Sequence, residues 1–431
     1  MELYPPDDPY FINFAIGTIP IVVRWYGVFI VGGAMIAAQW AGGRARERGI
    51  DPDHVWNLLM LGMVFGVLGA RLYYVAFEWP RFAGRPPVHP DVKKQADLAG
   101  RLWRGAQGLA EDVRYYGQWM RDQAEKRIGH LYPKVEVTAE MVKERPDLKP
   151  YLGRQLTVIA WLWARTVKSP NPAFAQVDVP LVSTFMLSTK AGKTAYVRPV
   201  IEDGGYRFTV RVGNTKDAGG ARNGTKLSRG ANFRCLMSES TPIDGDYIKA
   251  EGKAGRMGTR LMAIVAQGDR GRVYLSPTNE MESLARKGVA NWKPEQVLMG
   301  KSGDQLPLYG INQYWQLFTP RQLAALTTFA DLVAFVRQKV ASDVIEAGLS
   351  DNMQPLATTG SGAMSYANSV GVYLAIAISR MADYGSTLAT WRPKDSAMRS
   401  SLPKQALQMN WDFAEGSPFG KSEVPPILWT P

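Results

Sequence analysis

The chain has 431 residues, of which 46% are hydrophobic, so it is long enough for more than one domain with its own core. Its single cysteine, Cys235, excludes an internal disulfide framework and a cysteine-rich metal cluster. Residues 1–80 carry 5 Lys and Arg against 7 Asp and Glu, whereas residues 81–431 carry 46 against 32. The basic excess of the second part favours a polyanionic partner, either nucleic acid or an anionic membrane face, and says nothing about the fold.

Two apolar runs near the N-terminus are long enough to cross a bilayer. Residues 25–43 are apolar except for Gln39, and residues 55–70 are apolar except for Asn57. With its flanks, each run supplies the roughly 20 residues that a helix needs to cross a hydrocarbon core of ~30 Å. The sequence therefore predicts a two-helix transmembrane hairpin in residues 1–80, with a soluble helical hairpin as the alternative.

Basic residues lie between these runs and at their edges. The positive-inside rule places the loop of residues 44–48 in the cytoplasm. Arg24 and Arg71 stand at the edges of the apolar runs. A charge at such a position either extends to the interface or contacts a lipid phosphate, and the residues alone leave both interpretations open.

Three strings of this segment carry a family resemblance. They are Val23-Arg24-Trp25-Tyr26-Gly27, the loop of residues 44–48, and Gly66-x-x-Gly69-Ala70-Arg71-Leu72-x-Tyr74. With them, residues 4–82 resemble the first two membrane helices of bacterial prolipoprotein diacylglyceryl transferase. Enzymes of that family move a diacylglyceryl group from phosphatidylglycerol to a lipobox cysteine.

This resemblance implies a multi-pass protein of the bacterial inner membrane with a phosphatidylglycerol-like lipid as its partner. It also implies a partial site, in which Tyr26 is a polar group of the lipid cavity and Arg24 or Arg71 meets the lipid phosphate. The family's later His-Gly-Gly helix start and its Arg/Asn/Glu-rich signature do not occur in these 431 residues. The resemblance therefore implies no complete catalytic site.

Downstream of residue 80 the sequence alternates helical and strand patterns. Helical periodicity covers residues 110–127, residues 156–167 indicate a buried strand or a short helix, and three short apolar segments separated by turns predict a β-meander (residues 181–187, 194–201 and 206–212). Two more helices are expected at residues 319–347, starting at Thr319-Pro320, and at residues 364–384. Together they predict an α+β region made of a helical segment (81–150), a β-rich basic domain (151–300), a helical domain (301–419) and a divergent tail (420–431).

The most suggestive local motif is Gly252-Lys253-Ala254-Gly255-Arg256-Met257-Gly258-Thr259-Arg260. It is neither a Walker loop nor a dinucleotide fingerprint. Three glycines beside Lys253, Arg256 and Arg260 would let a phosphate approach the backbone N–H groups and the cationic side chains. A tight basic turn into the buried residues 261–265 is the alternative interpretation, and both stay open.

Six longer strings carry a second resemblance, namely residues 82–87, 108–117, 160–167, 249–258, 317–323 and 411–415. With them, residues 80–419 resemble the middle region of a family of adenine-specific DNA methylase-like proteins associated with anti-phage loci. That family uses S-adenosylmethionine. Its Gly-rich cofactor turn and its Asp-Pro-Pro-Tyr catalytic loop, which holds a flipped adenine, do not occur in this chain. The resemblance therefore implies no retained cofactor and, at most, non-specific DNA binding.

Some relatives in this family have one cysteine pair near Ser169 and Phe174 and another at Cys235 and Ser238, as a zinc ribbon requires. Only Cys235 is a cysteine here, so we expect no metal. The short string Pro80-Arg81-Phe82 fits both families, which is consistent with a join at this point. The sequence thus predicts a fusion of two incomplete transferases. The alternative is a diacylglyceryl transferase of lipoprotein biosynthesis, truncated to its first two helices.

Overall fold

The computed structural model describes residues 10–16, 19–24, 39–47, 51, 106–213, 218–227, 230–238, 241–269, 271–347, 362–402 and 406–420. The chain divides into two compact units. The first comprises residues 1–85 and 104–106, and the second comprises residues 86–103 and 107–431.

The described residues of the first unit form a β-hairpin and a short helix. Strand β1 (Tyr10–Ile16) pairs antiparallel with β2 (Ile19–Arg24), and the register sets Phe14 opposite Ile21. Residues 39–47 are helical, and the Arg44 guanidinium lies 4.4 Å from the centroid of the Trp40 ring.

The prediction of a two-helix transmembrane hairpin is wrong. None of the helices in the described ranges combines the length and the apolar character that crossing a bilayer requires. Residues 39–47 include Arg44, Arg46 and Glu47, and charges at the centre of a bilayer cost roughly 2.5 to 3.5 kcal/mol each. Residues 19–24 are rich in β-branched side chains, which favour the observed strand. Residues 25–38 and 55–70, which hold most of the two apolar runs, lie outside the described residues.

The second unit is built on a five-stranded antiparallel sheet with the order β13-β12-β5-β16, in which β6 also pairs with β5. Strand β5 (Val158–Lys168) pairs with β12 (Gly258–Gly268), β16 (Asp412–Gly416) and β6 (Asp178–Leu181). Strand β13 (Gly271–Leu275) returns from β12 through a hairpin. All of β5 except its last residue is buried, which explains its nearly continuous apolar and aromatic sequence. Of the two interpretations of residues 156–167, the strand is therefore confirmed.

A second sheet has the order β7-β8-β9 and confirms the predicted β-meander. Its strands are β7 (Met186–Ser188), β8 (Ala195–Glu202) and β9 (Gly205–Val212). The tight turn between β8 and β9 has a positive φ at Asp203 and at Gly204, as a two-residue hairpin turn requires. The first predicted strand is shorter than expected, because Leu181 belongs to β6 and lies opposite Arg165 of β5.

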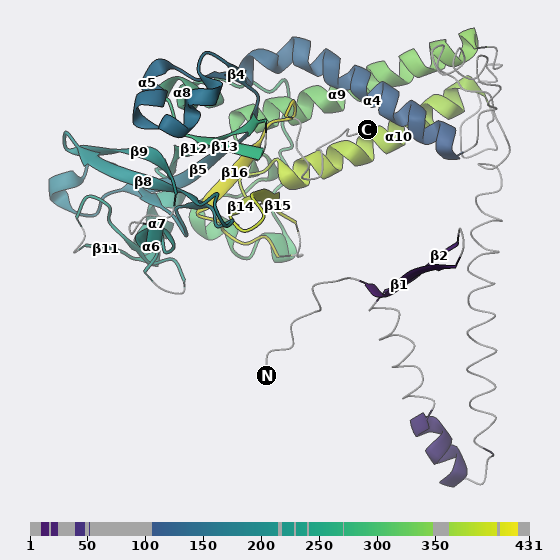
Figure 1. The fold of residues 1–431 in the computed structure, drawn as a ribbon, viewed down its shortest axis with the longest axis horizontal. Helices are drawn as coiled ribbons and strands as arrows, with labels where there is room; N and C mark the ends of the chain where they lie inside the picture. Colours follow the sequence, from purple (N-terminus) through teal and green to yellow (C-terminus); the bar gives the residue numbers. More distant parts are fainter. Residues whose placement is uncertain are drawn as a thin grey trace. The chain divides into compact units, whose positions relative to one another are not determined.

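Three long helices lie side by side and extend away from the sheets (Figure 1). They are α4 (Ala106–Ile128), α9 (Pro320–Glu346) and α10 (Ala363–Tyr384), and they confirm the three helices that periodicity predicts. A capping box formed by Thr319 and Gln322 starts α9. Apolar residues of these helices pack in one core with Trp161 and Trp163 of β5.

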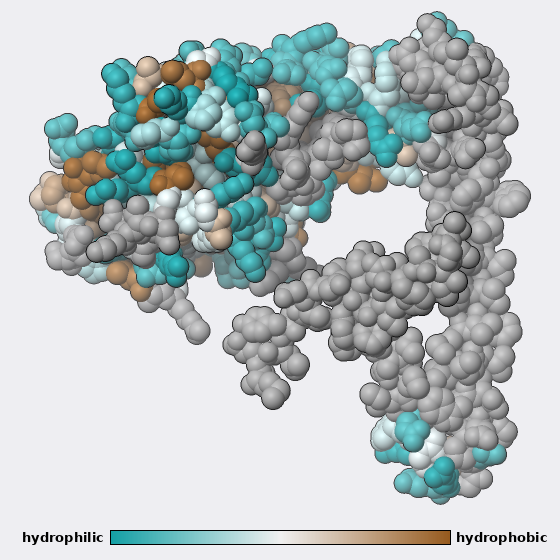
Figure 2. All heavy atoms as spheres, in the orientation of Figure 1, coloured by the Kyte–Doolittle hydropathy of each residue, from teal (hydrophilic) through white to brown (hydrophobic). Residues whose placement is uncertain are grey.

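Shorter elements complete the α+β architecture, and that part of the fold prediction is confirmed. They are β3 (Val135–Glu136), α5 (Ala139–Glu144), β4 (Gln155–Leu156), α6 (Ala218–Ala221), β10 (Phe233–Arg234), β11 (Pro242–Ile243), α7 (Gly245–Lys253), α8 (Asn279–Arg286), β14 (Thr390–Arg392) and β15 (Ala397–Arg399). Short 3-10 helices include η1 (Gly129–Leu131) and η5 (Leu306–Tyr309). Hydrophilic residues cover much of this unit on the face seen in Figure 2, where hydrophobic residues form separate groups.

An ion pair between α9 and β16 lies inside the core. Arg321 and Glu415 are both completely buried. The Nε and Nη2 atoms of Arg321 each donate to a different carboxylate oxygen of Glu415 at 2.9 Å. Trp163 of β5 donates to the same carboxylate at 2.8 Å, so one buried contact joins the central sheet to the helices.

Candidate nucleic-acid interface

The glycine-rich basic segment forms the end of α7 and the beginning of β12. The helix ends at Lys253, and Gly255 follows with φ +70°, in the left-handed region. The Gly255 N–H donates to the Gly252 carbonyl at 3.0 Å, and the Arg256 N–H donates to the Glu251 carbonyl at 2.9 Å. A glycine with this geometry is a common helix terminator. The backbone of the segment therefore caps the negative end of a helix dipole, and a phosphate would have to be met by side chains.

The first glycine of the motif serves helix packing. A Cβ atom on Gly252 would lie 2.5 Å from the carbonyl oxygen of Tyr309. A Cβ atom on Gly310, whose φ is +81°, would overlap the carbonyl oxygen of Gly252. These two glycines let α7 approach the turn that follows η5 more closely than any larger residue would permit.

Arg256 is already engaged by a carboxylate of the preceding helix, α7. Its Nη2 atom lies 2.5 Å from Oε1 of Glu251, and its Nε atom donates to both carboxylate oxygens at 3.1 Å. These hydrogen bonds raise the pKa of Arg256, so the guanidinium stays charged. The Glu251 side chain is almost fully buried, whereas Arg256 is exposed. Arg256 therefore supplies the counter-charge of a buried carboxylate.

Arg260 projects from β12 toward a different helix. Its Nε atom lies 3.3 Å from Oε2 of Glu282 on α8, and its guanidinium lies 5.5 Å from the centroid of the Tyr206 ring. Glu282 also pairs with Arg286 at 2.8 Å. Lys253 is exposed, and its side chain has no ion-pair partner in the part of the chain that the structure describes. The structure thus assigns Arg256 and Arg260 to separate carboxylates, and phosphate contact by the three cations stays a prediction.

A cavity of about 660 Å³ opens beside Arg260 and contains two arginines that the sequence analysis did not single out. Arg145 is buried and pairs with Asp147 at 2.6 Å. Arg207 pairs with Glu202 at 2.6 Å. The alternation of β9 indicates that Arg207 points away from the core, whereas no local signal reveals the burial of Arg145. Each arginine of this cavity has its own acid, so the cavity carries little net charge.

Of the three residues of the partial lipid site, only Arg24 lies in the part of the chain that the structure describes. Arg24 is the last residue of β2 and lies opposite Tyr10 in the hairpin register. Tyr26 and Arg71 lie outside the described residues. The proposed roles of these three residues therefore stay predictions.

Comparison with known proteins finds relatives of the N-terminal segment. The profile of the prolipoprotein diacylglyceryl transferase family matches residues 12–90. The phosphatidylglycerol–prolipoprotein diacylglyceryl transferase of Chloroflexus aggregans is 64% identical over 86 residues, covering 20% of this chain and 28% of that protein. The enzyme of the same description from Symbiobacterium thermophilum is 40% identical over 112 residues, covering 26% of this chain and 35% of its own length. That from Lactococcus lactis subsp. lactis is 39% identical over 67 residues, covering 16% and 26%.

The chain therefore spans about a quarter to a third of the length of the curated relatives that it matches. No solved structure matches the chain significantly. The family match reaches residue 90, so it crosses residues 82–87, which the sequence analysis also assigns to the methylase-like region. The methylase-like resemblance of residues 80–419 is not tested by these matches and stays a prediction. The N-terminal segment, residues 12–90, is similar to prolipoprotein diacylglyceryl transferases.

Proposed function

We propose that the chain joins a lipid-contacting segment of the diacylglyceryl transferase type to a basic, methylase-like region that binds DNA without sequence preference. In this proposal neither part carries a complete active site, and no S-adenosylmethionine is bound. The first part associates with the bacterial inner membrane through a phosphatidylglycerol-like lipid. The observation that carries this part is the 64% identity to a phosphatidylglycerol–prolipoprotein diacylglyceryl transferase over 86 residues.

Lipid contact by the N-terminal segment is testable through two arginines. At about 1 M salt the Debye length falls to roughly 3 Å, so the long-range attraction of the basic region to anionic vesicles is screened. Under these conditions we expect the full chain to float with vesicles that contain phosphatidylglycerol in preference to pure phosphatidylcholine vesicles. Changing Arg24 and Arg71 together to Gln should lower that partitioning about tenfold, because charge-assisted hydrogen bonds to phosphate are lost.

The matched control changes Arg44 and Arg46 to Gln, which removes the same charge from the exposed helix of the same segment. We expect this control to partition like the unchanged chain. Equal partitioning onto both kinds of vesicle, or an equal loss in both double variants, would refute lipid recognition by Arg24 and Arg71.

Two observations support the DNA-binding part. Residues 81–431 carry 46 Lys and Arg against 32 Asp and Glu, which supplies the charge that sequence-independent DNA binding needs. In the structure the Ser169 hydroxyl and the Cys235 thiol lie 3.3 Å apart, although they are 66 residues apart in sequence. In some methylase-like relatives one cysteine pair lies near Ser169 and a second includes the position of Cys235, so this contact is consistent with that resemblance.

The DNA-binding proposal predicts weak, salt-sensitive affinity for a 20-base-pair duplex. Binding should be roughly micromolar near 50 mM salt and largely lost by about 200 mM, in the range of non-specific binders. Changing Lys253, Arg256 and Arg260 to Gln should lower the slope of log affinity against log salt by about two to three units if all three contact phosphate. Fluorescence anisotropy at several salt concentrations measures this slope.

A control variant with Lys126, Lys143 and Lys149 changed to Gln removes the same charge from exposed positions on α4, α5 and the 3-10 helix η2 (Pro146–Tyr151). Its slope should change by less than about one unit. Equal slopes in the two triple variants would limit the glycine-rich segment to a structural role.

A further inference from the structure

Three helices are joined by side-chain hydrogen bonds at the end of the bundle that points away from the sheets (Figure 1). This helix junction consists of the start of α4, the end of α9 and the start of α10. The Tyr366 hydroxyl of α10 donates to Asp112 of α4 at 2.5 Å. The Tyr116 hydroxyl of α4 donates to Asp343 of α9 at 2.9 Å. Each helix is therefore linked to a neighbour through a tyrosine–aspartate contact.

The two aspartates of the junction differ in the support of their charged forms. Asp343 has a counter-charge, because it pairs with Lys339 at 3.1 Å. Asp112 is completely buried and forms no ion pair with any residue that the structure describes. Its Oδ2 atom accepts from Tyr366, whereas its Oδ1 atom is buried without a hydrogen-bond partner. A carboxylate can accept about four hydrogen bonds, so a single donor leaves the charged form of Asp112 poorly stabilised.

The groups around Asp112 favour its neutral form. Burial raises the pKa of its carboxyl to about 6, against the effect of the Tyr366 hydrogen bond and with a further contribution from Glu111. The titratable and charged groups that face the junction are Glu111, Tyr115 and Tyr116 on α4, Lys339 and Asp343 on α9, and Tyr366 on α10. Lys339 is the cation of this set, and it pairs with Asp343. Asp112 therefore changes its protonation state in a range where Asp343 keeps its counter-charge.

The junction lies close to the point where the chain passes from the first unit into the second. Helix α4 begins at Ala106, the last residue of the 104–106 segment that belongs to the first unit. Asp112 lies in the second turn of α4, and Tyr366 lies in the first turn of α10. Helix ends open more readily than helix centres, because fewer contacts hold them. A change in the contact between Asp112 and Tyr366 therefore acts on the helix that connects the two units along the chain.

We propose that Asp112 is a pH-sensitive switch, in which the protonated carboxyl keeps α10 against α4 and loss of its proton to solvent opens the contact. Once exposed, the carboxylate accepts hydrogen bonds from water that the closed junction does not supply. Asp343 keeps Lys339 in both states, so α4 and α9 stay joined through Tyr116. The switch involves no residue of the proposed lipid or DNA sites, so it stands independently of the proposed function.

Hydrogen–deuterium exchange of the full chain near pH 5 and pH 8, corrected for the intrinsic pH dependence of amide exchange, tests the switch. The Asp112 carboxyl has a pKa of about 6 in the closed junction and roughly 4 once exposed. Opening should therefore become about tenfold more frequent between the two pH values, and the amides of residues 367–374 on α10 should lose protection by that factor. At both pH values these amides should exchange at least about tenfold faster than those of β5, because local opening is more frequent than global unfolding.

Two variants identify the group that titrates. Asp112→Asn keeps an oxygen that accepts from Tyr366 but is neutral at every pH, so the tenfold change should disappear. Asp343→Asn is the matched control in the same junction, and the change should persist in it. The proposal is overturned if the unchanged chain has equal corrected protection at both pH values, if Asp112→Asn retains the change or if Asp343→Asn abolishes it. Equal exchange rates in α10 and β5 would also overturn it, since they would indicate global unfolding.

Discussion

Changing Glu415 to Gln, or Arg321 to Met, should lower the free energy of unfolding of the second unit by about 3 to 5 kcal/mol. Each change removes one partner of the fully buried ion pair between α9 and β16 and leaves the other without its counter-charge. Urea denaturation followed by tryptophan fluorescence measures the loss, because Trp161 and Trp163 lie in the same core.

The surroundings of the pair explain why the effect is large. Besides Glu415, Arg321 donates through Nη1 to the Leu131 carbonyl at 3.0 Å. Its guanidinium lies 3.9 Å from the centroid of the Trp161 ring. Thr319 donates to the Glu415 carboxylate at 3.1 Å. With these contacts in place, the surviving charge of either single variant would have to remain buried or draw water into the core.

A double variant with Arg321→Met and Glu415→Leu provides the control. It removes both charges together, so we expect it to lose clearly less stability than the sum of the two single variants. Lys249→Met, which breaks an exposed pair with Asp246, should change stability by less than about 1 kcal/mol. Additive losses in the double variant would show that the two residues do not act as a pair.

Changing Asp112 to Asn should stabilise the protein at pH 8 and have little effect near pH 4. Asp112 lies fully buried on α4 and accepts a hydrogen bond of 2.5 Å from the Tyr366 hydroxyl of α10. Burial raises the pKa of its carboxyl to about 6, the Tyr366 hydrogen bond partly opposes this rise, and the charge of Glu111 adds to it. The folded protein therefore favours the protonated carboxyl.

The sign of the effect follows from linkage. The carboxyl pKa is higher in the folded state than in the unfolded state, so the folded state binds more protons between about pH 4 and pH 6. Stability falls as pH rises through that interval, and above pH 6 the charged carboxylate costs roughly 1 to 3 kcal/mol. Asn is neutral at every pH and removes this cost.

Chemical denaturation from pH 4 to pH 8 measures the difference between Asp112→Asn and the unchanged chain. Asp122→Asn, an exposed position of the same helix, is the matched control and should follow the unchanged chain at every pH. Parallel pH profiles for Asp112→Asn and the unchanged chain would exclude a raised pKa at Asp112 as the source of the pH dependence.

Elements with strong local signals are those that the sequence predicts correctly. Thr319 followed by proline and Gln322 forms the capping box that starts α9, and the Asp203-Gly204 turn joins β8 to β9. These outcomes depend on hydrogen bonds and φ angles within a few residues, so tertiary contacts are not needed to predict them. The N-terminal family resemblance is also correct, because it depends on the order of residues alone.

Hydropathy was a poor guide at the N-terminus. Apolar runs of sufficient length predict membrane helices, yet none of the helices in the described ranges is long and apolar enough to cross a bilayer, and the helix at residues 39–47 joins the end of the first run to charged residues that were expected in a loop. In the glycine-rich segment, composition alone likewise does not reveal the structural roles of the glycines. Its composition suits a phosphate loop, but Gly255 ends α7 and Gly252 makes room for Tyr309.

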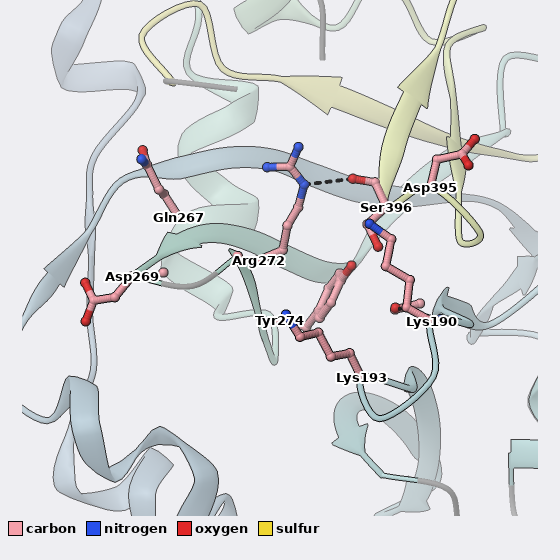
Figure 3. A pocket seen from close by; sticks show the side chains of 11 residues that line it. Lys190, Lys193, Gln267, Asp269, Arg272, Tyr274, Asp395 and Ser396 are labelled. Atoms are coloured by element: carbon pink, nitrogen blue, oxygen red, sulfur yellow. Dashed lines mark hydrogen bonds between the residues drawn. The ribbon is translucent and has the colours of Figure 1, made fainter. Parts of the chain in front are cut away.

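By itself, the amino-acid sequence determined the helices and strands with strong local signals, the basic charge of residues 81–431 and the relatives of residues 12–90. Only the tertiary structure decided which elements meet. It inserts β16 beside β5, pairs Arg321 with a glutamate 94 residues away, and brings the turns that follow β7, β12 and β14 together around Tyr274 (Figure 3). Such contacts depend on burial and packing between distant segments, whereas local patterns reflect only neighbouring residues.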